Sequence, residues 1–245
     1  MRLLSAALLV AAPLATPLVA QTTPAPSPRP TDAGGQMAAD PDQITTGGVQ
    51  VPGWSVRFDR AGANVSQVSF RRAGGGYRVT AGPSGVYYAP RTTASGNYTV
   101  AATFTQTKAP AHPEAYGLFA GGQNLDGAAP SYLYFVVRGD GKYLVKHRAN
   151  ATEVHTLVDW TASPALRAAG SDGRARNALE IRVAADSVRF VANGTPVAAV
   201  SRREAGTLAG VAGIRVNHNL DVQVDGFAVR RSAAAAARGG RRAAR

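Results

Sequence analysis

The sequence predicts an all-β domain built from two antiparallel sheets packed face to face. From about Asn97 to Val229, short runs of alternating apolar and polar residues recur, and turn residues such as Gly, Asn and Asp separate them. Within this stretch, only residues 160–169 (WTASPALRAA) offer a helical turn or two. Alternation with a period of two places successive side chains on opposite faces of a strand. One face of each sheet is therefore expected to be buried against the other sheet.

The expected strands of the first half are short and are separated by Gly-rich breaks. In the strand at 97–106, Tyr98 and Phe104 point to one face and the threonines to the other. Arg91 is expected in the turn that precedes this strand. The strands of this half are expected at residues 54–58, 65–71, 77–80, 85–88, 97–106 and 115–121.

The second half is predicted to consist of hairpins. Gly139-Asp140-Gly141 and Asn193-Gly194 supply the positive φ angles that tight turns need. The last strand is expected to be an outer one, with its aspartates facing solvent. We expect Tyr98, Phe104, Phe135 and Ile214 to meet in one interior. The strands of this half are expected at residues 131–138, 142–148, 177–183, 210–216 and 220–229, and residues 187–200 are expected to form two short strands on either side of the Asn193-Gly194 turn.

The chain ends differ in composition from the middle. Residues 1–20 have a positive start, an apolar run and a small-residue exit, which predict a secretory signal peptide cleaved near Ala20. Residues 21–47 are expected to be a flexible Pro/Thr/Gly linker, 48–231 a single β-sandwich domain, and 232–245 a basic disordered tail. We therefore expect a periplasmic or extracellular protein with no integral membrane span after cleavage. The chain has no cysteine, so its core must supply its stability.

The formal net charge is +12, and half of it comes from arginines at the C-terminal end. A basic cluster of this kind binds anionic polymers in a salt-dependent way, or is a solvated extension. Nucleic acid is not the expected partner, because no aromatic side chains that would stack on bases are interleaved with the arginines. These arginines are Arg230, Arg231, Arg238, Arg241, Arg242 and Arg245.

Several segments carry a resemblance to a known superfamily. The runs "YYAPRTTASGNYTVAATFTQ", "YLYFVVRGDGKYLVKHR", "NALEIRVAADSVRFVANGTPV" and "GVAGIRVNHNLDVQVDGFAV" resemble the jelly roll of the concanavalin A-like lectins and glucanases. In particular, they resemble laminin-G-like and 3-keto-disaccharide hydrolase-like domains of exported bacterial proteins. The resemblance implies a curved sheet whose concave face binds extended carbohydrate. The E-x-D-x-x-E motif of the glucanases and the calcium loop of legume-type lectins are absent from the sequence, so we predict no metal and no cofactor.

Glu114 is the first candidate site residue, because it begins an apolar strand where its carboxylate needs a partner. Arg138 and Arg91 are the candidate partners. The resulting polar cluster either hydrogen-bonds sugar hydroxyls at one end of the concave face or is a structural ion pair.

Tyr132 and Tyr134 lie on the same side of their strand as Arg138. They are either a platform for pyranose rings or ordinary buried tyrosines. On the partner strand, either His147 extends this side or its neighbours Lys146 and Arg148 do.

Asn217 and His218 stand where one strand turns into the last one, and they form either a loop-built ligand site or a simple asparagine turn. The four histidines show no spacing that binds a metal locally.

These observations favour an exported carbohydrate-binding or interaction module without catalytic activity. A first alternative is a hydrolase of glycans or 3-keto-disaccharides with Glu114 as its acid or base. A second alternative is an envelope-associated structural protein whose basic tail binds an anionic polymer.

Overall fold

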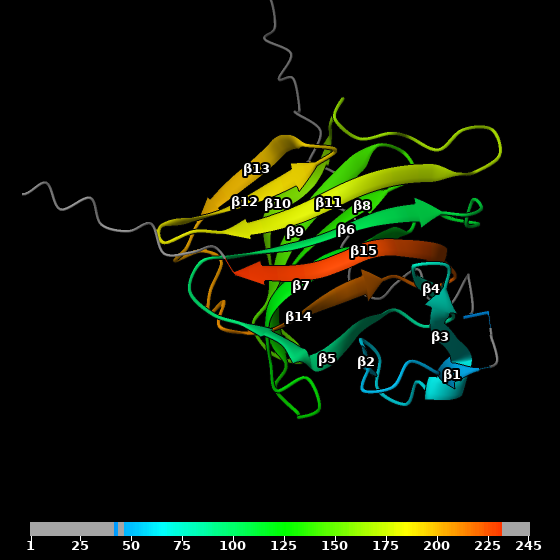
Figure 1. Ribbon diagram of the computed structural model, residues 1–245, viewed down its shortest axis with the longest axis horizontal. Helices are drawn as coiled ribbons and strands as arrows, with labels where there is room; N and C mark the ends of the chain where they lie inside the picture. Colours follow the sequence, from blue (N-terminus) through cyan, green and yellow to red (C-terminus); the bar gives the residue numbers. More distant parts are fainter. Residues whose placement is uncertain (1–41, 44–46, 232–245) are drawn as a thin grey trace, which may run out of the picture. The chain divides into compact units, whose positions relative to one another are not determined.

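The fold is a sandwich of two mainly antiparallel sheets, seen in a computed structural model that describes residues 42–43 and 47–231 (Figure 1). These residues contain fifteen strands and no α-helix, so the predicted all-β class is confirmed. None of their helical segments is long and apolar enough to cross a membrane. The predicted signal peptide, nearly all of the predicted linker and the predicted basic tail lie outside the described residues.

Strands far apart in the sequence are neighbours in both sheets. The first sheet has eight strands in the order β1 (Gly48–Val49), β3 (Val68–Ala73), β4 (Gly76–Ala81), β15 (Asp221–Arg231), β6 (Tyr98–Gln106), β11 (Ala175–Val183), β12 (Ser187–Ala192) and β13 (Thr195–Ser201). The second has seven in the order β10 (Val154–Ala162), β9 (Lys142–Arg148), β8 (Ser131–Arg138), β7 (Ala115–Gln123), β14 (Gly210–Val216), β5 (Gly85–Ala94) and β2 (Ser55–Phe58). Only β1 and β3 pair in parallel among the described strands.

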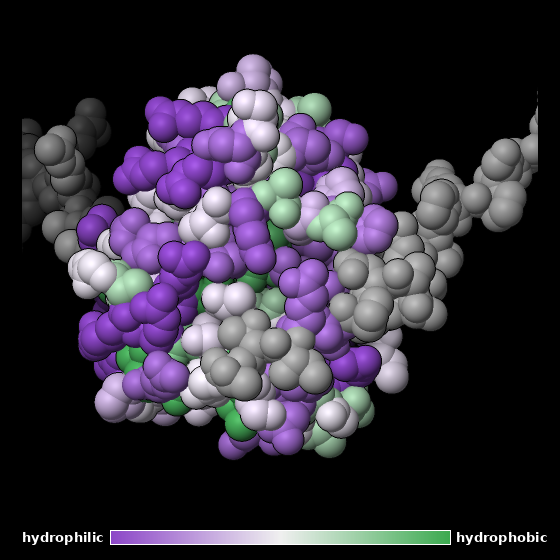
Figure 2. Space-filling model, turned by 90° about the vertical axis from the view of Figure 1, so that its right-hand side faces the viewer, coloured by the Kyte–Doolittle hydropathy of each residue, from purple (hydrophilic) through white to green (hydrophobic). Residues whose placement is uncertain are grey.

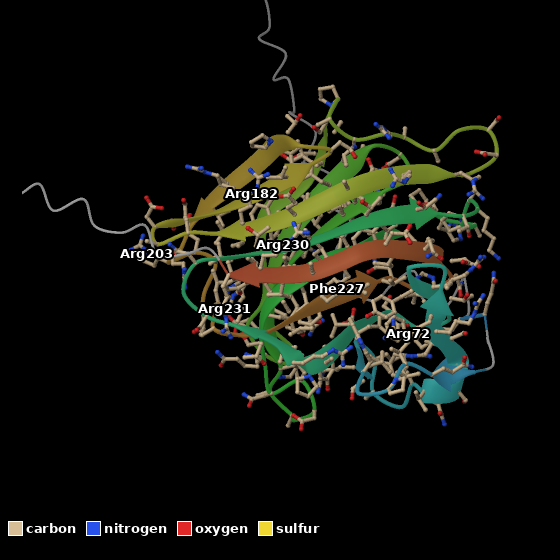
Figure 3. The ribbon with its side chains drawn as sticks, in the orientation of Figure 1. Arg72, Arg182, Arg203, Phe227, Arg230 and Arg231 are labelled. Atoms are coloured by element: carbon tan, nitrogen blue, oxygen red, sulfur yellow. The ribbon has the colours of Figure 1, made fainter. Side chains whose placement is uncertain are left out.

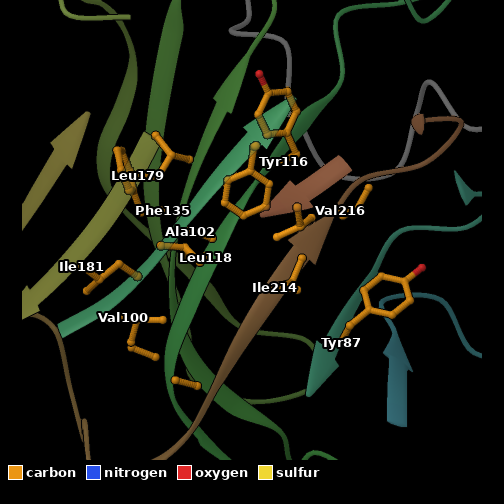
Figure 4. Close-up of a cluster of buried hydrophobic side chains, with 14 of the residues drawn as sticks. Tyr87, Val100, Ala102, Tyr116, Leu118, Phe135, Leu179, Ile181, Ile214 and Val216 are labelled. Carbon is orange, nitrogen blue, oxygen red and sulfur yellow. The ribbon is translucent and has the colours of Figure 1, made fainter. Parts of the chain in front are cut away.

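The interior lies between the two sheets and follows the predicted alternation (Figure 4). In β6 every second residue is buried, from Tyr98 through Phe104, whereas the intervening residues are half-exposed. Phe135 of β8 and Ile214 of β14 belong to the same buried cluster. The predicted meeting of these four side chains in one core is therefore confirmed.

Both predicted tight turns form where the sequence supplies residues that tolerate positive φ. Asn193 and Gly194 have φ of 50° and 84° and join β12 to β13. Gly141, with φ of 78°, closes the turn from β8 to β9. The ends of β8, β9 and β14 coincide with the predicted ranges.

Some local predictions were wrong. Residues Val65–Gln67 form a 3₁₀ turn rather than the start of a strand, because the Asn64 side chain accepts from Ser66 N and that of Gln67 accepts from Asn64 N. Strand β5 continues through Arg91, which is not in a turn. Strand β15 is central rather than outer, since it pairs with both β4 and β6.

The segment predicted to be helical is part strand and part loop. Trp160 lies in β10, whose pairing with β9 shifts register twice, so the period of two is broken and the strand is hard to see in the sequence. The loop after it is fixed by two asparagines, the buried Asn177 and the half-buried Asn193. Asn177 bonds both backbone groups of Arg167, at 2.9 and 3.0 Å, and Asn193 Nδ2 donates to Ala165 O at 2.8 Å.

The two sheets differ in what their outer faces carry. Strands β7 and β8 are buried on both faces, and a second apolar cluster covers the outer face of the seven-stranded sheet. The outer face of the eight-stranded sheet is half-exposed and polar. Figure 2 shows the side at the right of Figure 1, where the surface is mainly hydrophilic and its hydrophobic patches are small and separate. Val65 is the one large hydrophobic side chain that is exposed among the described residues.

Candidate functional site

The outer face of the seven-stranded sheet is a layer of aromatic side chains with guanidinium groups stacked on them. Arg215 lies 4.6 Å above the ring of Tyr134, and Arg148 lies 5.8 Å from that of Tyr132. Strand register brings these residues together, because Tyr132 is opposite Arg148 and Arg215 is opposite Gly117, which has no side chain. Stacking of this kind is favourable for Arg, whose planar group is weakly hydrated.

A carboxylate that follows β2 completes the group, which we term the Asp59 cluster: Asp59, Tyr132, Tyr134, Arg148 and Arg215. Arg215 donates to both oxygens of Asp59, with Nη2 to Oδ2 at 2.6 Å and Nη1 to Oδ1 at 3.1 Å. Tyr132 donates its hydroxyl to Asp59 at 3.3 Å and accepts from Arg148 Nε at 3.1 Å. Arg148 Nη2 is 3.7 Å from Asp59 Oδ1. One carboxylate thus pairs with two cations, so the Asp59 cluster keeps a net positive charge.

Burial and charge set the protonation states of the Asp59 cluster. Burial on its own would raise the pKa of Asp59, but the charge and hydrogen bonds of Arg215, the charge of Arg148 and the Tyr132 hydroxyl together hold it below its usual value. Burial, with the charge of Asp59, raises the pKa of Tyr132 to about 12. At neutral pH the cluster therefore presents an ionised carboxylate, a protonated phenol and two guanidinium groups.

Access differs within the Asp59 cluster. The side chain of Asp59 is 25% exposed and that of Arg148 is 13% exposed, whereas Arg215 is only 7% exposed. Tyr132 and Tyr134 are only 1% and 6% exposed, so little ring surface is free for stacking. The two tyrosines lie on the face that was predicted, but they orient the charged groups instead of forming an open platform.

Half-exposed side chains extend this face on both sides of the Asp59 cluster. Lys146 is opposite Tyr134 in the register, and Tyr88 lies across β14 from the cluster. Arg57 Nη1 donates to the carbonyls of Leu125 and Gly127, at 3.0 and 2.5 Å, and so fixes the loop between β7 and β8. The face therefore offers a shallow strip of charged and aromatic groups that runs across several strands.

Glu114 forms a separate pair at the start of β7. Its Oε1 is 3.1 Å from Nδ1 of His218, and the two side chains are 14% and 13% exposed. Asn217 lies beside them and donates its backbone N–H to Ala115 O at 2.8 Å. Three predicted site residues are thus brought together, but the predicted partner of Glu114 was wrong. The partner is His218, and neither Arg138 nor Arg91 contacts Glu114.

Comparison with known protein families and with curated protein sequences finds no match. Solved structures do match. The carbohydrate-binding module CBM66 from Bacillus subtilis has a TM-score of 0.54 at 9% identity, covering 76% of this chain and 99% of its own. A protein of unknown function with a galectin-like fold from B. subtilis gives 0.52 at 13%, covering 73% and 89%. Alginate lyase A1-II′ of polysaccharide lyase family 7 gives 0.50 at 14%, covering 74% and 95%.

The chain has a concanavalin A-like jelly-roll fold. The resemblance predicted from the sequence is therefore confirmed for the fold. At these identities the comparisons describe architecture, and the chemistry of this chain must come from its own side chains.

The other predicted site residues are distributed around this concanavalin A-like sandwich. Arg138 shares the face of Tyr132 and Tyr134 as predicted, but it pairs with Asp140 at 2.6 Å and lies 4.1 Å above Trp160. Arg91 lies 5.6 Å from the ring of Trp54.

His147 is on the opposite face from the tyrosines, because it is opposite Leu133, whose side chain is in the core. The alternative placement, with Lys146 and Arg148 extending the tyrosine side, is the one that forms.

Sequence reasoning did not select Asp59 or Arg215. A signal for Arg215 exists, since it stands in the apolar strand GVAGIRV, where a cation requires a buried counter-ion. Nothing local identifies Asp59 as that counter-ion, because 156 residues separate the two. Among the described residues, no group of three His, Asp or Glu side chains is arranged to hold a metal ion.

Proposed function

We propose that this protein is a glycan-binding module and that the outer face of the seven-stranded sheet is its binding surface. The observation that carries the proposal is the Asp59 cluster, in which an ionised carboxylate and guanidinium groups are held in fixed orientations at the surface. The concanavalin A-like fold, shared with a carbohydrate-binding module, supports it at the level of architecture. Charged, preorganised hydrogen-bonding groups beside aromatic rings are the usual composition of a sugar site.

Each accessible group has a defined task in this proposal. Asp59 accepts hydrogen bonds from sugar hydroxyls through its exposed edge, and Arg148 donates to neighbouring oxygens. Because Arg215 and Tyr132 already orient Asp59, little side-chain entropy is lost when a ligand binds. Lys146 and Tyr88 contact sugar units on either side of the Asp59 cluster. The shallow strip suits an extended chain rather than a single enclosed sugar.

Affinity gel electrophoresis of the full chain with soluble neutral glycans (β-glucan, xylan and mannan) tests the proposal. We expect at least one glycan to retard the wild-type protein and Lys146→Ala to weaken that retardation. Lys108→Ala is the matched control, because it removes the same charge from a loop next to the other sheet. Absence of retardation on every glycan, or equal behaviour of the two lysine variants, would contradict the assignment.

Hydrolysis at Glu114 is the second candidate function, and the carboxylate–imidazole pair with His218 favours it. Such a pair is a common acid–base arrangement, in which one group positions the proton of the other. The assay is turnover of a 3-keto-glycoside by the wild type and by Glu114→Gln and Glu153→Gln, the latter being an exposed control. Wild-type turnover that only Glu114→Gln abolishes would establish this function. Unchanged turnover in Glu114→Gln would eliminate Glu114 as the acid or base.

A further inference from the structure

We propose a second ligand surface, on the outer face of the eight-stranded sheet, that binds an acidic polysaccharide. It lies on the opposite side of the sandwich from the Asp59 cluster and does not depend on the proposed function of that cluster. Two rows of side chains that cross the sheet define it, and we call it the arginine face.

The first row joins three arginines on four consecutive strands. Arg189 of β12 is opposite Arg182 of β11, which is opposite Thr99 of β6, and Thr99 is opposite Arg230 of β15. Neighbouring strands are about 4.8 Å apart, so the row spans roughly 14 Å. All three arginines are exposed, and Figure 3 shows Arg182 and Arg230 on the viewer's side of the sheet.

The second row crosses the same sheet nearer its other end. Arg176 of β11 is opposite Thr105 of β6, followed by Gln223 of β15 and Arg78 of β4. This row borders a depression of about 430 Å³. The lining residues of the depression are Arg78, Thr105, Thr107, Lys108, Arg174, Asp221 and Gln223. Arg176 and Arg182 are six positions apart on one strand, so the rows are separated by about 20 Å.

Small side chains form part of the floor between the two rows, beside Glu180 of β11 and Asp225 of β15. Ala178 is opposite Thr103, and Ala101 is opposite Ala228. A polymer can therefore lie flat across the sheet and reach cations at both ends.

The carboxylates on this face leave a positive excess. Glu180 is paired with Arg182 at 2.6 Å, and Asp221 binds Arg78 through both oxygens at 2.8 Å. Asp225 accepts a hydrogen bond from Gln223 Nε2 at 2.9 Å. The six arginines and Lys108 of this face outnumber these three carboxylates. Among the described residues, neither Arg189 nor Arg230 has a carboxylate within ion-pair distance. Arg174, Arg176 and Lys108 add to the excess at the other end of the face.

The composition of the arginine face favours an acidic polysaccharide over other anions. Arg binds carboxylates and sulfates through two parallel hydrogen bonds, and the threonine hydroxyls between the arginines complement sugar hydroxyls. The rows contain no aromatic side chain on which bases could stack, which disfavours single-stranded nucleic acid. Among residues 47–231, no large apolar side chain is exposed on this face to enter a lipid surface.

The test measures binding of the full chain to alginate at low salt for Arg189→Gln/Arg230→Gln. The matched control is Arg91→Gln/Arg167→Gln, which removes the same charge from exposed positions outside both rows. Each exposed charge pair contributes modestly, so we expect the Kd of the first variant to rise about fivefold to tenfold and that of the control to change less than twofold. Arg189→Lys/Arg230→Lys should recover part of the affinity, because the charge is kept but the two parallel hydrogen bonds of each arginine are lost. Equal weakening in target and control would overturn the proposal.

Two further arms separate binding at the arginine face from binding elsewhere on the chain and from a preference for nucleic acid. If Arg238→Gln/Arg241→Gln/Arg242→Gln/Arg245→Gln abolishes alginate binding while Arg189→Gln/Arg230→Gln binds as the wild type does, the C-terminal arginines are the site and the proposal is wrong. If duplex DNA binds more tightly than alginate at the same salt, through the same arginines, the assigned ligand class is wrong. Lys146→Ala should leave alginate binding unchanged, which distinguishes this surface from the Asp59 cluster.

Discussion

Asp59→Asn is the most informative single change, because it separates the charge of the carboxylate from its shape. The variant keeps a side chain of the same size that can still accept one hydrogen bond. It leaves Arg215, 7% exposed, without its counter-ion. Nε of Arg215 is buried and has no hydrogen-bond partner among the described residues, so it does not compensate for the contacts with Asp59 that the variant loses.

The expected loss of stability follows from burial. Removing one partner of a fully buried ion pair costs about 3–5 kcal/mol. Asp59 is 25% exposed, so solvent reduces the effect, and we expect about 2–3 kcal/mol. For a domain of this size the melting temperature falls by about 2–4 °C per kcal/mol, which predicts a decrease of about 4–12 °C.

Urea unfolding measures this loss, with Glu180→Gln as the control for an exposed ion pair, expected to cost about 0.5 kcal/mol or less. The double variant Asp59→Leu/Arg215→Met should be about as stable as the wild type, to within about 1 kcal/mol, because replacing both partners of a buried ion pair by apolar side chains often leaves the free energy of unfolding unchanged. A loss in Asp59→Asn no larger than in Glu180→Gln would refute the reasoning that Arg215 depends on this carboxylate.

Three further predictions concern pH and the buried Asn177. The pKa of Asp59 in the folded protein lies below 3.8, so its ion pair contributes fully to stability above that pH, and the contribution is lost as the pH falls through the folded-state pKa. The stability of Asp59→Asn should therefore fall less steeply than that of the wild type below pH 3.8. Burial and the nearby charge of His155 hold the pKa of His147 below 6.5 in the folded protein. The unfolded chain therefore binds the proton more readily, and the stability of the wild type should fall as the pH is lowered from about 7.5 to about 5.5. Urea unfolding midpoints should show a smaller fall in His147→Gln than in the exposed control His112→Gln. Asn177→Ala removes three side-chain hydrogen bonds from a buried site and should cost about 2–4 kcal/mol, with faster hydrogen exchange at Arg167 N–H as the local sign. Slow exchange at that amide in the variant would contradict the role given to Asn177.

The fold was largely predictable because the core obeys a local rule. Tyr98 and Phe104 alternate with threonines, and the Asn193-Gly194 pair can hardly be anything other than a tight turn. Strand β10 was not predicted, because its two register shifts, between Thr156 and Val158 and between Val158 and Thr161, break the alternation. The segment after β10 is a loop and not the predicted helix, because the side chains of Asn177 and Asn193 form hydrogen bonds with its backbone. Both asparagines belong to a different hairpin of the chain.

The candidate site was less predictable, because its decisive contacts join distant parts of the chain. Alternation placed Tyr132, Tyr134 and Arg138 on one face, and the structure agrees. Alternation along one strand does not set the register between strands, so it could not decide between His147 and Lys146. Nor could it find the carboxylate that neutralises Arg215.

The two outer faces of the sandwich hold their arginine side chains in different ways, and we infer different roles for the two faces from this difference. On the seven-stranded sheet, Arg215 is buried on a tyrosine ring and locked to Asp59, which costs desolvation but fixes direction. Fixed direction is what recognition of neutral hydroxyls requires. On the eight-stranded sheet, Arg189 and Arg230 remain hydrated and free to turn, which costs little and suits long-range attraction to a charged polymer. Neutral-glycan binding should therefore depend weakly on salt and alginate binding strongly, so the ionic-strength dependence of each ligand identifies the face that it uses.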